Sequence, residues 1–276
     1  MKKIIKTLLA GVMAITSLFA FNACGNDTIY VNTNAYFAPF EYYQGTEIVG
    51  VDVDIMNKVG ERLGKKVKFV NTDFDVIIDN VASGKQYDCG AAGITITQAR
   101  AQRVDFSNPY YTSVQYVIYD ATSIVSFPER TATDGTACVF WSDLMNMDLG
   151  VQRDTTGNIY ADIEINGDGP DYPGELAGTT GELKPFDNAE VAVAALGIQV
   201  DAVIVDELPA KYITSKNSQY VCKALYYDAD TATEEQYAIA VTKGNKELLD
   251  AINAVLAELG EEGINALVKQ HLGLTD

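Results

Sequence analysis

Hydrophobic positions recur along the chain with two periods that alternate. Short runs rich in β-branched residues, such as Thr28–Thr33 and Val67–Val70, predict strands. Between these two runs, Ile55, Val59 and Leu63 are spaced four residues apart, which places them on one face of a helix. Strands that alternate with amphipathic helices at this pitch predict βαβ units and a mostly parallel sheet.

The same alternation extends to the C-terminus. Further strands are predicted at 88–92, 149–151, 202–206 and 236–241, and further helices after Asp73, after Thr97, from Thr155, and at 188–196, 207–215, 246–259 and 262–272. Two stretches follow neither period, residues 126–147 and residues 166–181. We expect both to be irregular, and the second to be a surface insertion because it is rich in Gly, Pro and Asp.

The first 23 residues have the layout of a secretory signal, with a basic start and an apolar run. The run ends at Ala23-Cys24-Gly25-Asn26, and a small residue directly before Cys resembles a bacterial lipoprotein processing site. We therefore expect a chain lipidated at Cys24 and anchored outside the cytoplasm, or a periplasmic one. Cleavage near Ala20 by an ordinary signal peptidase and a retained anchor stay open as alternatives.

The charge balance limits the partners. The 276 residues carry 20 Lys and Arg against 38 Asp and Glu, a net charge of −18. Nucleic acid is not expected as a partner, because binding its phosphates needs clustered basic residues. The length suits one large domain or two ordinary ones.

Motifs of catalysis and cofactor binding are missing from the sequence. His271, the only histidine, falls in the last predicted helix, where we expect it to be exposed or to complement the helix dipole. There is no Gly-x-Ser-x-Gly elbow, phosphate loop, dinucleotide fingerprint or zinc spacing, so no catalytic residue, cofactor or metal is expected. Cys89, Cys138 and Cys222 are expected to be buried thiols, with a Cys138–Cys222 disulfide left open.

Polar groups follow the predicted strands. In open α/β sheets, ligands bind beyond the carboxyl ends of the strands. The residues that fall there are Asn34, Gly93, Thr95, Thr155, Thr156 and Asp206, with Arg100 on the helix after Thr97.

Six runs carry a family resemblance: residues 33–42, 48–54, 92–100, 104–111, 203–207 and 243–245. In this order they resemble the polar amino-acid-binding proteins of bacterial ABC importers, the extracellular solute-binding proteins of family 3. The resemblance implies a monomer with a two-lobed periplasmic-binding-protein-like α/β fold, each lobe a mostly parallel sheet flanked by helices. Lobe 1 would comprise 28–114 plus 238–276 and lobe 2 would comprise 115–237, joined by hinge strands at 115–118 and 236–239.

The resemblance also implies a function, the capture of a free L-amino acid between the lobes for a membrane permease. Arg100 would bind the carboxylate, since its planar fork suits bidentate contacts. Asp206, with the Gly93 carbonyl, would hold the ammonium. Phe37 and Phe74 would sandwich the side chain, and the remaining implied contacts are Asn34, Tyr36, Ile94, Thr95, Thr155 and Thr156. Taken singly, Arg100 also suits an ion pair with Asp105, and Asp206 a helix cap.

Three positions depart from the family pattern. Tyr36 stands where many relatives carry an acid, and Asn34 stands where those selecting basic amino acids carry Asp, so we expect a neutral polar ligand. Asp154 replaces a usual Gly before Thr155. Relatives on this fold also include cyclohexadienyl or arogenate dehydratases, for which Asp154 is the acid to examine, and ligand-sensing modules of receptors; both stay open as alternative functions.

Overall fold

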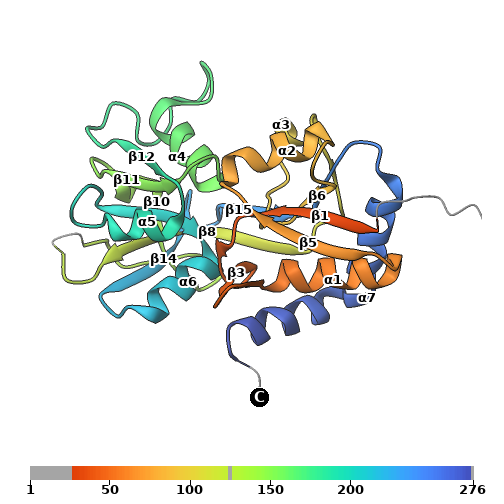
Figure 1. The fold of residues 1–276 in the computed structure, drawn as a ribbon. Coiled ribbons are helices and arrows are strands. Elements are labelled where there is room, and N and C mark those ends of the chain that lie inside the picture. Colours follow the sequence, from red (N-terminus) through yellow and green to blue (C-terminus); the bar gives the residue numbers. More distant parts are fainter. Residues whose placement is uncertain (1–26, 124–125, 275–276) are drawn as a thin grey trace, which may run out of the picture.

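The computed structural model describes residues 27–123 and 126–274, so the predicted signal 1–23 and Cys24 lie outside the described residues. Figure 1 shows two lobes, each a sheet with helices on both faces, which confirms the predicted two-lobed α/β architecture.

The sheet of the first lobe has five strands. Their order is β5 (Lys66–Asn71), β1 (Thr28–Thr33), β6 (Cys89–Gly90), β16 (Ala240–Val241) and β7 (Asp105–Phe106). β1 pairs in parallel with β5 and β6, whereas β16 runs antiparallel to both of its neighbours. A small antiparallel sheet precedes the first helix and consists of β2 (Tyr36–Phe37), β3 (Glu41–Gln44) and β4 (Glu47–Val49).

Helices cover both faces of this sheet (Figure 1). One face packs against α1 (Val51–Leu63) and α7 (Lys246–His271), and the other against η1 (Phe74–Val76), α2 (Ile77–Ser83) and α3 (Gln98–Ala101). Ile55 and Val59, predicted to face the core, are fully buried. The two C-terminal helices predicted at 246–259 and 262–272 form one element with a break at Gly260, whose φ of 57° a glycine adopts readily.

The sheet of the second lobe is larger. Its order is β12 (Leu183–Phe186), β11 (Leu149–Gln152), β13 (Ala202–Asp206), β8 (Tyr111–Asp120), β14 (Tyr220–Tyr226), β10 (Ala137–Phe140) and β9 (Arg130–Thr131). β11 is parallel to β12 and β13, and β8 is antiparallel to β13 and β14. Its helical elements are η2 (Trp141–Leu144), α4 (Thr156–Asn166), α5 (Ala189–Ala194) and α6 (Glu207–Lys216).

Strand β13 shows why a continuous apolar run marks a strand covered on both faces. Ala202 and Ile204 pack in a cluster with Ala161 of α4, while Val203 and Val205 pack with residues of α5 and α6. Successive side chains of a strand point to opposite faces, so both sets must be apolar. Asp206, the last residue of this strand, therefore lies at the edge of the sheet that faces the first lobe.

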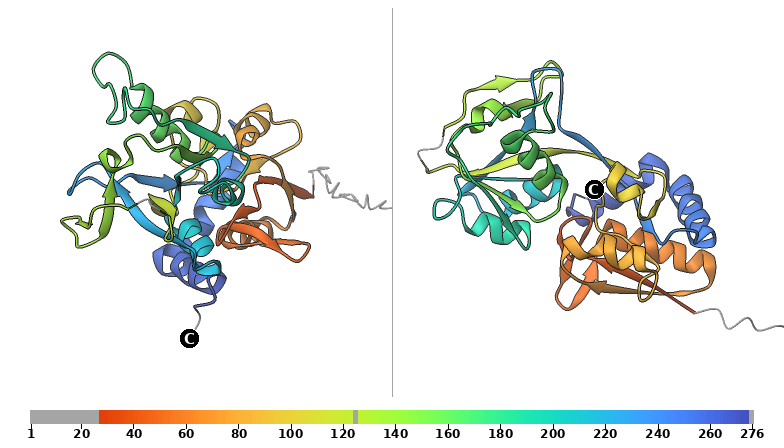
Figure 2. Two further views of the ribbon diagram at one scale, coloured as in Figure 1. Left: turned by 90° about the vertical axis from the view of Figure 1, so that its left-hand side faces the viewer. Right: turned by 90° about the horizontal axis from the view of Figure 1, so that it is seen from above.

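Two paired strands join the lobes. β15 (Glu234–Tyr237) pairs antiparallel with Tyr111–Val114 of β8, and Figure 2 shows these strands passing between the two lobes. The pairing lies a few residues before the predicted crossing at 115–118, because Gln115 and the residues after it already pair within the second sheet.

One expectation was wrong. The stretch 126–147 is not irregular, since it contains β9, β10 and η2. Cys138 and Val139 of β10 are both buried, so this short strand beside β14 shows no alternating period.

Of the two roles expected for His271, exposure is excluded, because its side chain is 10% exposed and contacts Asp54 at 2.9 Å. Its place in the last turn of α7 agrees with the other role, at the helix dipole. The stretch predicted to be irregular, 166–181, contains no helix or strand beyond Asn166, which ends α4.

The remaining expectations concern thiols, metals and membranes. Cys89, Cys138 and Cys222 are free thiols in the structure. Within residues 27–123 and 126–274, no group of three acidic, histidine or cysteine side chains is placed to hold a metal ion. In the same part of the chain, no helix combines the length and apolar character that crossing a bilayer requires.

Candidate functional site

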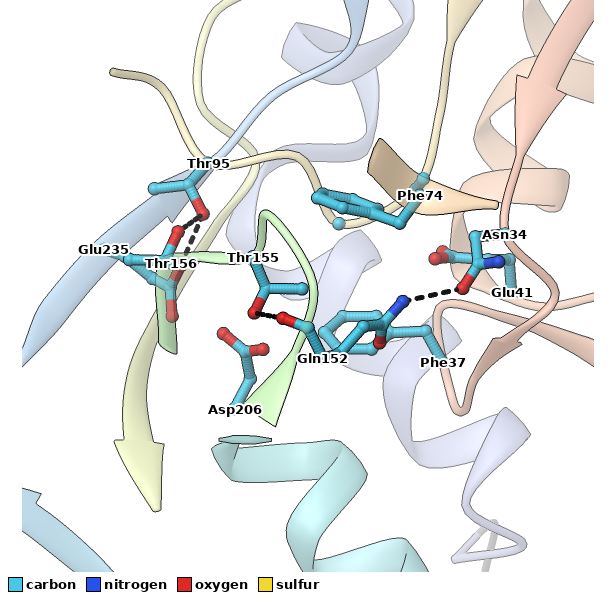
Figure 3. Close-up of a pocket in the computed structure, with 12 residues that line it drawn as sticks. Asn34, Phe37, Glu41, Phe74, Thr95, Gln152, Thr155, Thr156, Asp206 and Glu235 are labelled. Atoms are coloured by element: carbon cyan, nitrogen blue, oxygen red, sulfur yellow. Dashed lines mark hydrogen bonds between the residues drawn. The ribbon is translucent and has the colours of Figure 1, made fainter. Parts of the chain in front are cut away.

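A narrow cavity lies between the lobes, beside the paired strands that join them (Figure 3). Eight of the predicted site residues line this cavity: Asn34, Phe37, Phe74, Gly93, Thr95, Thr155, Thr156 and Asp206. Four residues that the sequence did not single out complete the lining: Glu41, Ala92, Gln152 and Glu235. Asp206 and Glu235 lie at one side, the Asp206 end, and Asn34 and Glu41 at the opposite side, the Glu41 end.

Two aromatic rings form opposite walls of the cavity, as Figure 3 shows. Phe74 comes from η1, and Phe37 from β2, where it packs against Phe40 and Tyr237 with ring centroids 5.8 and 6.2 Å away. Gly93 lies against Phe37: a Cβ atom at residue 93 would be 2.5 Å from the ring, and φ there is +53°. Only glycine fits this position without displacing the wall.

Arg100 lies behind Phe74 and connects the lobes. Its guanidinium donates to the carbonyl of Thr95 at 3.0 Å and, across the lobes, to the carbonyl of Asp154 at 2.7 Å. It also stacks on the Phe74 ring, 5.5 Å from the centroid. Arg100 is only 8% exposed and Asp105 pairs with Lys243 instead, so the surface ion pair considered from the sequence does not form.

The Asp206 end is a continuous hydrogen-bond network. The Gln115 amide donates to Asp206 at 2.8 Å and also to Glu235. The second oxygen of Glu235 accepts from the Thr95 hydroxyl, to which the Thr156 hydroxyl donates across the lobes at 2.6 Å. Burial, and then repulsion from Asp206, raise the pKa of Glu235 well above its usual range. The Asp206 side chain makes no capping hydrogen bond to α6, and its carboxylate lines the cavity instead.

At the Glu41 end, a buried carboxyl lies beside that of Asp52. Glu41 is fully buried, and neither of its oxygens accepts a hydrogen bond from a donor among the described residues; the carboxyl of Asp52 is its hydrogen-bonding neighbour. Burial, helped by the negative charge of Asp52, raises the pKa of Glu41 well above its usual value. Asp52 itself accepts from the Tyr110 hydroxyl at 2.6 Å and the Gly93 backbone N–H at 3.1 Å, and burial raises its pKa to about 6. Buried polar groups normally have partners, so Glu41 is a candidate contact for a donor group of a ligand.

A second contact between the lobes borders the Glu41 end. The Gln152 amide donates to the Asn34 side-chain oxygen at 3.0 Å, and the Asn34 amide donates to the Thr72 carbonyl at 2.7 Å.

The N-terminus of α4 lies at the cavity. The Thr155 side chain caps α4 by accepting from the backbone N–H of Asn158, which confirms the predicted helix start. The unpaired N–H groups of such a terminus favour an anion.

Three predicted site residues lie outside the cavity lining. Arg100 is the first, as described. Tyr36 is 39% exposed against Tyr43, because it precedes Phe37 on a strand and neighbouring side chains point to opposite faces. Ile94 is fully buried in the apolar core beneath the cavity. Asp154, the acid considered for an enzyme, is not among the lining residues either.

The lining residues that the sequence analysis did not predict differ in how much signal the sequence contains for them. Glu41 lies inside the run 33–42 that carried the family resemblance, and Gln152 directly follows a predicted strand end. Glu235 gave no signal, because its position depends on how β15 pairs with β8.

Two lobes, a joining pair of strands and a polar cavity between them are the architecture of a protein that binds a small solute between its lobes. Residues 29–273 match the sequence profile of the bacterial extracellular solute-binding proteins, family 3. The chain belongs to this family, which confirms the resemblance seen in the sequence.

Three comparisons illustrate its similarities. A probable histidine-binding protein of Campylobacter jejuni is 24% identical over 96% of this chain and 98% of its own length. The arginine-binding extracellular protein ArtP of Bacillus subtilis is 25% identical, covering 95% of this chain and 94% of that protein. The solved structure of an ancestral arginine-binding protein bound to glutamine superposes with a TM-score of 0.72 at 30% identity, covering 90% and 99%. These relatives are amino-acid-binding proteins rather than enzymes.

Proposed function

We propose that this protein captures a free L-amino acid between its lobes, outside the cytoplasm, and delivers it to the permease of an ABC importer. The observation that carries the proposal is a cavity between the lobes that is lined by the Asp206 carboxyl and by Thr155 and Thr156 at the start of α4. Arg100, from the first lobe, is buried against Phe74 outside this lining. A zwitterion brings an ammonium and a carboxylate on one carbon, so it would be held at both ends only when the lobes are closed.

The carboxylate would sit at the N-terminus of α4, where Thr155 and Thr156 line the cavity. Arg100 lies outside the cavity lining and donates to the carbonyls of Thr95 and Asp154, so its guanidinium would have to move to contact the carboxylate directly. The ammonium would contact Asp206. The side chain would then run between Phe37 and Phe74 towards Glu41.

The buried carboxyl of Glu41 accepts no hydrogen bond from a described donor, which supports a ligand whose side chain ends in N–H donors. Burial and the neighbouring Asp52 raise the pKa of Glu41, which favours the neutral form of this acid in the empty site. A neutral acid pairs with a neutral amide without creating a buried charge, which favours the neutral polar ligand expected from Asn34. A cationic side chain, such as that of the arginine bound by several relatives, would have to expel the proton of Glu41.

Thermal unfolding of ligand-free protein with each of the twenty amino acids tests the proposal. A ligand at 100 times its Kd adds about 2.7 kcal/mol, which corresponds to a shift of several degrees for a chain of this size. We expect L-glutamine to give the largest shift and L-glutamate none. A larger shift with L-arginine or L-histidine would overturn only the choice of side chain, whereas no shift with any amino acid would overturn the function.

We also propose that Cys24 carries the lipid that holds the protein at the membrane. Incorporation of a labelled fatty acid into the wild-type protein, and its loss in Cys24→Ser, is the expected result. Label retained by the variant would contradict the assignment.

A further inference from the structure

The Asp206 end contains two acids where a single ammonium is expected. Glu235 is 5% exposed and lines the cavity beside Asp206. One amide group, that of Gln115, donates to both carboxyls. Gln115 is fully buried on β8 and Glu235 lies on β15, so the two strands that join the lobes hold the two acids together.

No cation pairs directly with these acids in the described part of the chain. The positive charge of Arg100 acts on both acids from a distance, but its guanidinium donates to the carbonyls of Thr95 and Asp154 instead. The other titratable groups facing Glu235 are Asp206, Tyr160 of α4 and Tyr237 of β15, none of which supplies a positive charge. Arg100 therefore forms no direct ion pair with either acid, and burial beside Asp206 favours the protonated form of Glu235.

We propose that Glu235 is a second carboxyl of the ammonium subsite and that it releases its proton to solvent when the ammonium of the ligand enters. This inference rests on the proposed function and assigns Glu235 a role in specificity. The ligand ammonium replaces the proton: the acid and the ammonium form an ion pair, and one proton passes to the buffer. The hydroxyl of Thr95 and the amide of Gln115 hold the Glu235 carboxylate in place on either side.

The exchange predicts how binding responds to pH. Because a proton leaves as the ligand enters, raising the pH strengthens binding over the range in which Glu235 is protonated in the empty protein. Affinity then rises by up to about tenfold per pH unit. The burial and the neighbouring Asp206 that raise the pKa of Glu235 place this range above the ordinary range of a carboxyl.

Calorimetry in buffers of different ionisation enthalpy counts the protons directly. The probe is the L-amino acid that gives the largest thermal shift, expected to be L-glutamine. In a series of pH values, we expect the wild-type protein to release close to one proton per ligand over the range in which Glu235 is protonated in the empty protein. Glu235→Gln keeps the size of the side chain, can still accept from the Gln115 amide and can donate to the Thr95 hydroxyl, but it cannot ionise. It should therefore release no proton and bind about tenfold or more weakly. Glu234→Gln, on the exposed side of the same strand, is the matched control and should behave as wild type.

Each contrary result has a distinct meaning. Binding without proton release in the wild type overturns the inference but leaves the proposed function standing. Release that persists in Glu235→Gln and disappears in Glu41→Gln assigns the proton to the other end of the cavity and also overturns it. A Glu235→Gln protein with wild-type affinity and an unchanged pH profile shows that the residue is only structural. Absence of binding by every amino acid overturns the proposed function itself.

Discussion

The two ends of the cavity differ in how a buried acid is hydrogen-bonded. At the Asp206 end, both oxygens of Glu235 accept hydrogen bonds from neighbouring side chains. At the Glu41 end, neither oxygen of Glu41 accepts a hydrogen bond from a donor among the described residues, and its hydrogen-bonding neighbour is a second acid, Asp52. An unsatisfied buried group costs about 1–3 kcal/mol, and a ligand that satisfies it recovers this free energy. The difference suggests that the Asp206 end is prearranged for the part common to all amino acids, whereas the Glu41 end selects the side chain.

The largest effect is expected from removing the charge of Asp206. Asp206→Asn keeps the size of the side chain and the contact with Gln115, but it leaves the ligand ammonium without its principal carboxylate. Loss of one partner of a buried charge pair costs about 2–5 kcal/mol. We therefore expect affinity for the amino acid to fall by about a hundredfold or more in titration calorimetry.

Asp171→Asn, an exposed change in the same lobe, is the control for Asp206→Asn and should bind normally. If Asp206→Asn binds within a few-fold of wild type, the ammonium is held elsewhere and the comparison of the two ends fails.

An intermediate effect is expected from Glu41→Gln, which should alter the free energy of unfolding and its dependence on pH. The folded state raises the pKa of Glu41 above its value in the unfolded chain. The stabilisation associated with this group is therefore fully present below the unfolded pKa and is lost as the pH rises through the folded pKa. Glu41→Gln removes the group that ionises, so the ligand-free variant should lose less stability towards alkaline pH and gain about 1 kcal/mol at neutral pH.

Denaturant unfolding at several pH values measures this difference. Glu47→Gln, on the neighbouring strand β4 and exposed, should follow the wild-type curve. A Glu41→Gln protein whose stability falls with pH as steeply as that of wild type would show that Glu41 is not a neutral acid in the empty site.

The sequence predicted those features of the site that depend on local order along the chain. Strand ends placed Thr95 and Asp206 at the cavity, and the cap at Thr155 was visible because helix starts have a local signature. Features that depend on pairing between distant segments were not visible. Glu235 enters the cavity only because β15 pairs with β8, and Tyr36 leaves it because the strand period fixes its side opposite to Phe37.

The smallest effect is expected at Asp154, which stands where the family usually has Gly. Its φ is +58°, a left-handed conformation that costs most L-residues about 1–2 kcal/mol and Asp somewhat less. Asp154→Gly removes this strain but makes the unfolded chain more flexible, so the two effects largely offset each other. We expect a net gain of about 0.5 kcal/mol, or about 1–2 °C in Tm.

Ligand affinity decides what Asp154 contributes to the site. The structure uses its backbone carbonyl, which accepts from Arg100, and places the residue outside the cavity lining. Because any residue supplies this carbonyl, Asp154→Gly should bind the amino acid within about twofold of wild type, and so should Asp154→Asn, which keeps a side chain in the left-handed conformation but lacks the charge. A tenfold change shared by both variants would mean that the carboxylate acts on the ligand, which would add a third acid to the cavity and undo the contrast between its two ends.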